Sequence, residues 1–192
     1  MNRRSQGERT ETTRAALVQA ARGLFEERGY AGTGTPEIVA AAKVTRGALY
    51  HHFTDKAELF EAVARQLAQE VADEIARQAS GHSDPVEALM AGAQAYFAAM
   101  ARQGRARLLL LEAPAVLRAE QVMALSDVAG LGALQEGLQE ALRGDDKTAV
   151  PLRELAVLLS AAFDRAALAI ARGESAAPYE QAIRLLLSRL VA

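Results

Sequence analysis

The chain has 192 residues, and its 22 basic and 24 acidic side chains give a formal net charge of -2, which by itself indicates no class of partner. Hydrophobic residues make up 51% of the sequence, enough for a folded core, and this argues against a disordered chain. The absence of cysteine excludes disulfides, thiol nucleophiles and cysteine-based zinc sites. No apolar stretch approaches ~18 residues and no apolar leader follows Met1, so we expect a soluble cytoplasmic protein with no membrane partner.

The apolar pattern predicts an all-α fold of about nine helices, because Ala and Leu dominate and β-branched runs are absent. A polar, arginine-containing arm leads into the first helix, expected over residues 10–28 and ended by Gly29. Two short helices are expected over 35–42 and 45–52, with only Lys43 and Val44 between them. Helices joined by so short a link must cross steeply, which is the geometry of a helix-turn-helix.

A fourth helix, expected over residues 55–79, is long enough to connect two domains. The remaining helices are expected over 85–102, 105–112 (ending before Pro114), 119–142, 151–172 and 178–191, with a loop at 144–147. We therefore divide the chain into an N-terminal head, residues 1–54, and a helical body, residues 55–192. The charges differ accordingly: residues 1–56 carry nine basic and six acidic side chains, and the remainder carries 13 and 18.

The head contains a recognisable motif. Its residues are Gly29-Tyr30, Thr33, Glu37-Ile38-Val39, Val44-Thr45, Gly47-Ala48-Leu49-Tyr50-His51-His52-Phe53 and Asp55-Lys56, with Leu59 and Phe60 beyond. This pattern strongly resembles the tetracycline-repressor (TetR) family of transcriptional regulators. The resemblance implies a homodimer that binds a palindromic double-stranded DNA operator and, most often, a repressor that a small molecule releases. It implies neither an enzyme nor a cofactor.

The resemblance also implies which head residues contact DNA. Phosphate contacts are expected from Thr35, Tyr50, His51 and Lys56, and the base-facing surface from Thr45, Arg46, Gly47 and Ala48. Thr33 and Lys43 are also expected to contact the DNA. Arg46 either donates two bonds to a guanine edge or touches phosphate only. Thr33 or Thr35 is expected to cap the second helix and Thr45 the third, which leaves backbone N–H groups directed at phosphates.

Two positions of the head depart from the family pattern. Lys43 stands where the family usually has Gly; if that position is left-handed, Lys costs about 1 kcal/mol unless it also reaches a phosphate. Pro36 is also atypical, so no base contact is expected from the second helix.

Other chemistry-bearing patterns point to no second activity. Gly29, Gly32 and Gly34 follow a helix and lack the spacing of a nucleotide-binding loop, and the adjacent His51 and His52 do not form a metal-ligand motif. Ser160 and Asp164 have no partnering His, and we interpret them as polar residues at the surface or core edge. We therefore expect no metal and no enzyme activity.

The last two expected helices each carry two apolar faces, which predicts a four-helix dimer interface, the alternative being burial within a monomer. The interface residues expected are Leu155, Leu159, Ala162, Phe163, Ala166, Ile183, Leu186, Leu187 and Leu190. The middle helices are expected to enclose a pocket for a hydrophobic effector. Its expected lining, or else ordinary core, is Met90, Tyr96, Phe97, Met100, Leu110 and Met123. We expect Glu112 to point outward, the alternative being an inward position from which it could orient a cationic or hydrogen-bonding ligand. Two other functions remain open: a helical sensor or carrier that has lost DNA binding, and an activator.

Overall fold

The computed structural model describes residues 6–143 and 151–191, and in these ranges it contains helices and no strand. The head holds α1 (Gln6–Arg28), α2 (Thr35–Ala42) and α3 (Arg46–His52), and α4 (Lys56–Ala79) and α5 (Pro85–Met100) follow. Two composite helical stretches come next. The first consists of α6 (Arg105–Arg107), η1 (Leu108–Glu112) and α7 (Ala113–Val116). The second consists of α8 (Ala119–Ser126), η2 (Asp127–Leu131) and α9 (Gly132–Ala141). The last helices are α10 (Leu152–Ala171) and α11 (Ala177–Val191). These are nine continuous helical stretches within the described ranges, so the all-α prediction is confirmed.

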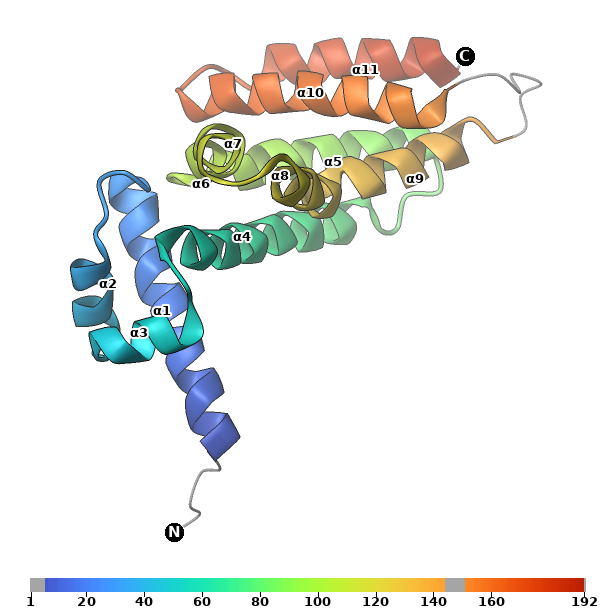
Figure 1. The fold of residues 1–192 in the computed structure, drawn as a ribbon. Coiled ribbons are helices and arrows are strands. Elements are labelled where there is room, and N and C mark those ends of the chain that lie inside the picture. The colour runs from blue at the N-terminus through green and yellow to red at the C-terminus, as the bar shows by residue number, and fades with distance from the viewer. Residues whose placement is uncertain (1–5, 144–150, 192) are drawn as a thin grey trace.

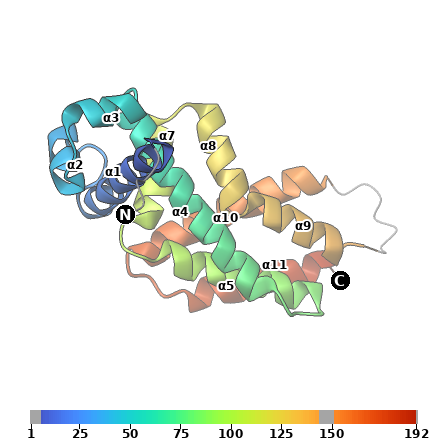
Figure 2. The same ribbon diagram turned by 90° about the horizontal axis from the view of Figure 1, so that it is seen from below.

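The body is layered, and the head lies at one end of it. In Figure 1, α4 runs away from the head, α5 and α9 lie above it, and α10 and α11 form the outermost layers. Seen from below, α8 and α9 lie along one side of α4 and α5 along the other (Figure 2). Helix α4 is therefore the structural connection between the head and the layers of the body.

The core of the head is built from residues at helical spacing. Leu17, Ala21 and Phe25 recur every four residues of α1 and are fully buried, as are Ile38 of α2 and Leu49 of α3. Phe53, directly after α3, is buried as well, at 2% exposure.

Helix α4 also contributes to this core. The ring of Phe60 lies 5.3 Å from that of Phe25, edge-on, and 5.0 Å from that of Tyr30. The start of α4 is therefore fixed to the head.

The helix expected to end before Pro114 instead continues to Val116. It passes through the wide π-helical turn η1, after which the N–H of Ala113 donates to Leu108 O. Pro114 then falls in the first turn of α7, where a residue without an N–H is tolerated. The predicted stop was therefore wrong.

The helix expected over 119–142 is broken into three segments. Gly130 has φ 152°, a left-handed value that other residues rarely adopt, and a Cβ there would lie 3.2 Å from Ile75 Cδ1. The bend therefore brings η2 close against α4. The loop expected at residues 144–147 and the arginines Arg3 and Arg4 of the arm lie outside the described residues.

Buried ion pairs join the head to the body. Arg105 is 1% exposed, and its Nη2 lies 2.8 Å from Glu70 Oε2, an oxygen that also accepts from Arg22 Nη2 of α1 at 2.9 Å. Nearby, Arg107 Nη2 donates to the carbonyls of Phe25 and Glu26 at the end of α1, at 2.9 and 3.1 Å. The last turns of α1 are thus held by α4 and α6.

Glu112 points toward the head. Its Oε2 accepts a 2.7 Å hydrogen bond from the backbone N–H of Tyr30, and its Oε1 lies 3.3 Å from Arg107 Nε. Gly29, at φ 76°, makes room for this contact, since a Cβ there would lie 2.6 Å from Glu112 Oε1. Glu112 is only part-buried, and its partners belong to the head and to Arg107.

Candidate functional site

Helix α3 turns one side to the core and the other to solvent. Leu49 and Phe53 are buried, whereas Arg46, Tyr50 and His51 are exposed. The guanidinium of Arg46 lies 5.5 Å from the centre of the Tyr50 ring, a cation–π distance. The exposed part of α3 therefore presents a cation stacked near an aromatic ring, and an imidazole beyond them.

The N-terminus of α3 is capped and unobstructed. Thr45 Oγ1 accepts a hydrogen bond from Ala48 N at 3.2 Å, which confirms the predicted cap. At Gly47, an added Cβ would meet only Thr45 Oγ1, at 3.9 Å. This end of the helix can therefore approach a flat or grooved partner closely.

Tyr50 links α3 to the start of α2. The pKa of the Tyr50 hydroxyl is lowered below its ordinary value, first by a hydrogen bond with the Thr35 side chain and second by one with the Arg46 side chain. Thr35, Arg46 and Tyr50 are therefore adjacent, although they come from two helices.

The turn between α2 and α3 has a left-handed residue at Lys43, which is the case for which the sequence predicted strain. Lys43 has φ 55° and ψ 40°, and within the described ranges it is the one non-glycine residue with positive φ. Its N–H donates to Ala40 O and that of Val44 to Val39 O, so the turn closes α2 despite a strain of about 1 kcal/mol. The side chain is exposed next to α3.

Thr33 does not belong to this surface. It is 2% exposed, and its hydroxyl donates to Gly29 O at 2.8 Å, so it cannot reach a phosphate. The N-cap of α2 is Gly34, whose N–H donates to Glu37 Oε2 at 2.8 Å. The predicted DNA contact of Thr33, and the cap from Thr33 or Thr35, were therefore wrong.

Lys56 has an intramolecular role that the sequence did not predict. Its Nζ donates to Tyr30 O at 2.9 Å and to Thr33 O at 3.0 Å, and lies 4.0 Å from the centre of the Tyr30 ring. Two of its three N–H groups are used, so a phosphate contact would depend on the third. Its place in the first turn of α4, where the helix dipole disfavours a cation, was the signal that it needed a partner.

The described residues contain no cluster of three or more His, Cys, Asp and Glu side chains that could hold a metal ion. In the same ranges, no helix has both the length and the apolarity to cross a membrane.

A partly open cavity of about 140 Å³ lies between α4, α5 and the helices from η1 to α10. Three of the predicted lining residues, Tyr96, Met100 and Leu110, do line it. Met90 and Phe97 are buried in core outside the cavity, and Met123 is 59% exposed. Helix α8 instead turns Val122 and Leu125 toward the cavity. The periodicity of the sequence did not determine which face of this helix points inward.

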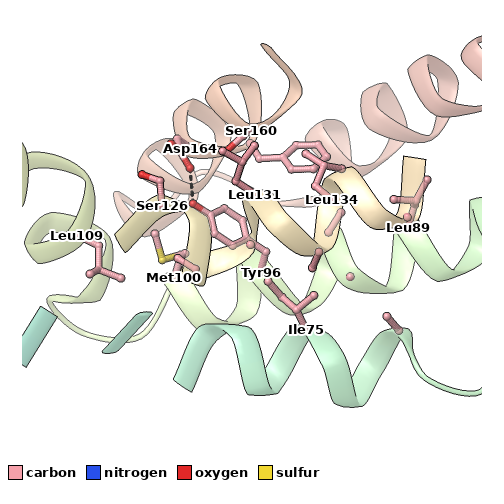
Figure 3. Close-up of a pocket in the computed structure, with 18 of the residues that line it drawn as sticks. Ile75, Leu89, Tyr96, Met100, Leu109, Ser126, Leu131, Leu134, Ser160 and Asp164 are labelled. Carbon is pink, nitrogen blue, oxygen red and sulfur yellow. Dashed lines mark hydrogen bonds between the residues drawn. The ribbon is translucent and has the colours of Figure 1, made fainter. Parts of the chain in front are cut away.

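Asp164 of α10 lies at the cavity wall, and its Oδ1 accepts a hydrogen bond from the Tyr96 hydroxyl, as Figure 3 shows. Burial raises the pKa of the Asp164 carboxyl, and the Tyr96 hydrogen bond opposes that rise. Burial and the adjacent carboxylate both raise the pKa of Tyr96. The interpretation of Asp164 as a polar residue of the surface or core edge missed its place in the cavity.

The expected dimer surface was partly misplaced. Phe163, Ala166, Ile183 and Leu187 are buried within the protomer, because one apolar face of α10 and of α11 packs inward. Ala162 and Leu186 are exposed, and Leu155, Leu159 and Leu190 are partly buried. The other exposed large hydrophobic side chains of these helices are Val157, Leu158 and Leu185, and Leu158 is 70% exposed. Uncovered apolar side chains therefore lie on α10 and α11, which are the outermost helices in Figure 1.

A capped, exposed recognition helix on a three-helix head, joined to a layered helical body, defines a helix-turn-helix protein of the class that regulates transcription. Residues 17–63 match the family described as "Bacterial regulatory proteins, tetR family", and residues 86–192 match "Tetracyclin repressor-like, C-terminal domain". The chain belongs to the TetR family of regulatory proteins, which is a family of DNA-binding regulators and not of enzymes.

Individual relatives agree with this assignment. The chain is 45% identical over 82 residues to the HTH-type transcriptional regulator TtgR of Pseudomonas putida, covering 43% of this chain and 38% of that protein. It is 32% identical over 117 residues to the regulator HbdR of an Aromatoleum species, covering 61% and 51%. The chain thus matches about half or less of these relatives' length. A TetR-family regulator from Pectobacterium atrosepticum superposes with a TM-score of 0.73 at 29% identity, over 97% of this chain and 95% of that one.

Proposed function

We propose that this chain is a homodimeric transcriptional repressor that binds a palindromic DNA operator and is released from it by a small, largely hydrophobic effector. The observation that carries the proposal is the outer side of α3, where Arg46, Tyr50 and His51 are exposed beyond a capped N-terminus. A helix of this kind enters the major groove with its N-terminal residues at the base edges. Residues 1–54 form the DNA-binding unit of the proposal, and residues 55–192 form the effector-binding and dimerisation unit, in a protein of the cytoplasm.

In this proposal Arg46 reads a base edge, and Gly47 and Ala48 let the backbone come close. Lys43, Thr35, Tyr50 and His51 border the groove and hold phosphates. Lys56 contributes first by fixing the turn after α1, through its bonds to Tyr30 O and Thr33 O.

The dimer would form on the apolar surface of α10 and α11, where Leu158, Leu185 and Leu186 are exposed. Two such protomers related by a two-fold axis present two α3 helices to two half-sites.

Effector binding would act through elements that touch both the cavity and the head. Ile75 of α4 lines the cavity, and Phe60 of the same helix packs in the head core. Leu109 of η1 lines the cavity too, while Glu112 of η1 holds Tyr30. A ligand that shifts α4 or η1 would change the separation of the heads and lower operator affinity by population shift.

The test is a titration of labelled DNA from the region upstream of the gene, at several salt concentrations, with three proteins. Arg46→Ala should relax the preference at one base position in each half-site, whereas Lys43→Ala should weaken all sequences equally and reduce the salt slope by about 1. Equal, sequence-independent losses from both would remove the base-reading role of Arg46. No binding by the wild-type protein to any such DNA would favour a sensor without DNA binding.

A further inference from the structure

The volume of the cavity indicates the size of the ligand body that it can hold. Its volume of about 140 Å³ is close to that of an engineered cavity of about 150 Å³ that binds benzene. A ligand with a body of one ring and a short side chain therefore matches this space.

The cavity is apolar except for one group of polar side chains on its wall. Leu89, Leu131 and Leu134 form part of the apolar wall. In Figure 3, Asp164, Ser126 and Ser160 lie around the hydroxyl of Tyr96, with Leu109 on one side of this group and Leu89 on the other. Ser126 Oγ already donates to Val122 O at 3.2 Å, and Asp164 is the one charged side chain among the described lining residues.

Asp164 has no cationic partner among the described residues. No Lys or Arg in those ranges pairs with it, and its one hydrogen bond comes from the neutral hydroxyl of Tyr96. A carboxylate has about four acceptor sites, and Tyr96 fills one of them. Removing an unpaired charge from water is costly, and a ligand that supplied a positive charge and N–H donors would offset this cost.

We propose that the cavity binds a small organic cation, an ammonium group on an apolar body of about one ring, with the ammonium on Asp164 and the ring among the leucines. The binding of this cation does not depend on the proposed function. Only the further step, that this ligand is the effector, rests on the proposed function. The apolar body agrees with the hydrophobic effector predicted from the sequence, and the positive charge is the new element.

Three probes with one skeleton test the charge: 2-phenylethylammonium, the neutral isostere propylbenzene and the anion 3-phenylpropanoate. Calorimetric titration of the full chain without DNA should show the cation binding about tenfold or more tighter than propylbenzene, because a charge-assisted bond forms with Asp164. The anion should not bind measurably.

Matched variants separate charge from shape. Asp164→Asn retains an acceptor for Tyr96 and should weaken the cation about tenfold or more while leaving propylbenzene unchanged. Asp127→Asn, an exposed acid outside the cavity, should change nothing. Tyr96→Phe should keep the preference for the cation, since Asp164 retains its charge, whereas a merely structural Tyr96–Asp164 pair predicts equal losses from both cavity variants. Circular dichroism checks that each variant is folded.

The proposal is overturned if propylbenzene binds as tightly as the cation, if Asp164→Asn leaves the cation affinity unchanged, or if none of the three probes binds. DNA release is measured separately, by adding 2-phenylethylammonium to the operator complex. A cation that binds the cavity without releasing DNA contradicts the proposed function and leaves the binding inference standing.

Discussion

The Oε2 atom of Glu112 accepts a 2.7 Å hydrogen bond from the backbone N–H of Tyr30, a residue 82 positions earlier in the chain. Replacing Glu112 with Ala should lower the free energy of unfolding by about 1–3 kcal/mol, because the part-buried N–H of Tyr30 loses its acceptor. Urea denaturation measures the loss, and Glu136→Ala, an exposed acid on α9, is the control with an expected effect below about 0.5 kcal/mol. Equal stability of the two variants would show that the contact contributes nothing.

Lys56→Met should destabilise the head by about 1–2 kcal/mol, because the carbonyls of Tyr30 and Thr33 lose a charged donor. Met keeps most of the aliphatic chain, so the loss reports on the ammonium. Limited proteolysis should show faster cleavage in residues 30–34, and thermal unfolding should show a lower midpoint. An unchanged cleavage rate would mean that the turn does not depend on Lys56.

Lys43→Gly should raise the free energy of unfolding by about 1 kcal/mol, since Gly adopts φ 55° without the steric cost of a Cβ. Lys43→Ala removes the same charge but keeps the Cβ, so it should give no such gain. Urea denaturation of both variants then separates the free energy of backbone strain at residue 43 from the effect of removing the charge. If Ala stabilises as much as Gly, the gain comes from removing charge and the strain argument fails.

Asp164→Asn should stabilise the free protein at neutral pH. Burial raises the folded-state pKa of Asp164 above its unfolded value, so the carboxyl favours the fold at low pH and this contribution is lost as pH rises through the folded pKa. Tyr96, the other titratable side chain of the cavity, has a pKa raised by burial and stays neutral in this range. The difference in melting temperature between variant and wild type should therefore grow from pH 4 to pH 7. A difference independent of pH would contradict it.

Leu158→Glu and Leu186→Glu should each convert the proposed dimer to a monomer, because both side chains are exposed on the outer helices and a charge buried there without a partner is costly. Sedimentation over a range of concentrations measures this. Met123→Glu, at a position equally exposed on α8, should leave the oligomeric state unchanged. A wild-type protein that sediments as a monomer would remove the proposed interface.

The head was largely predictable from the sequence, since α2 has the expected bounds and α3 begins one residue later than expected. Short amphipathic helices with one core leave little freedom, and Thr45 has the predicted role as the cap of α3. What could not be predicted was how far Thr33 and Lys56 turn inward. Both roles depend on carbonyls of the turn after α1, which no residue pattern reveals.

The body was predictable in helix number and less so in detail. Helix α10 has apolar residues on most of its surface, so periodicity could not tell that Phe163 faces the interior and Leu158 the solvent. The wide turns η1 and η2 depend on local backbone packing, as at Gly130 against Ile75, and not on hydrophobic period. The set of residues that line the cavity therefore follows from the three-dimensional packing and not from the sequence pattern.

Arg105 is buried where α6 meets α4, and its Nε and Nη1 have no hydrogen-bond partner. Its charge is offset by Glu70, which also holds Arg22, and by Glu74 at 3.5 Å. Losing one acid would leave a buried guanidinium poorly compensated, while losing the arginine would remove a cation that both acids share. Over evolutionary time these positions should therefore change in concert, and a lineage that abandons Arg105 should replace Glu70 as well.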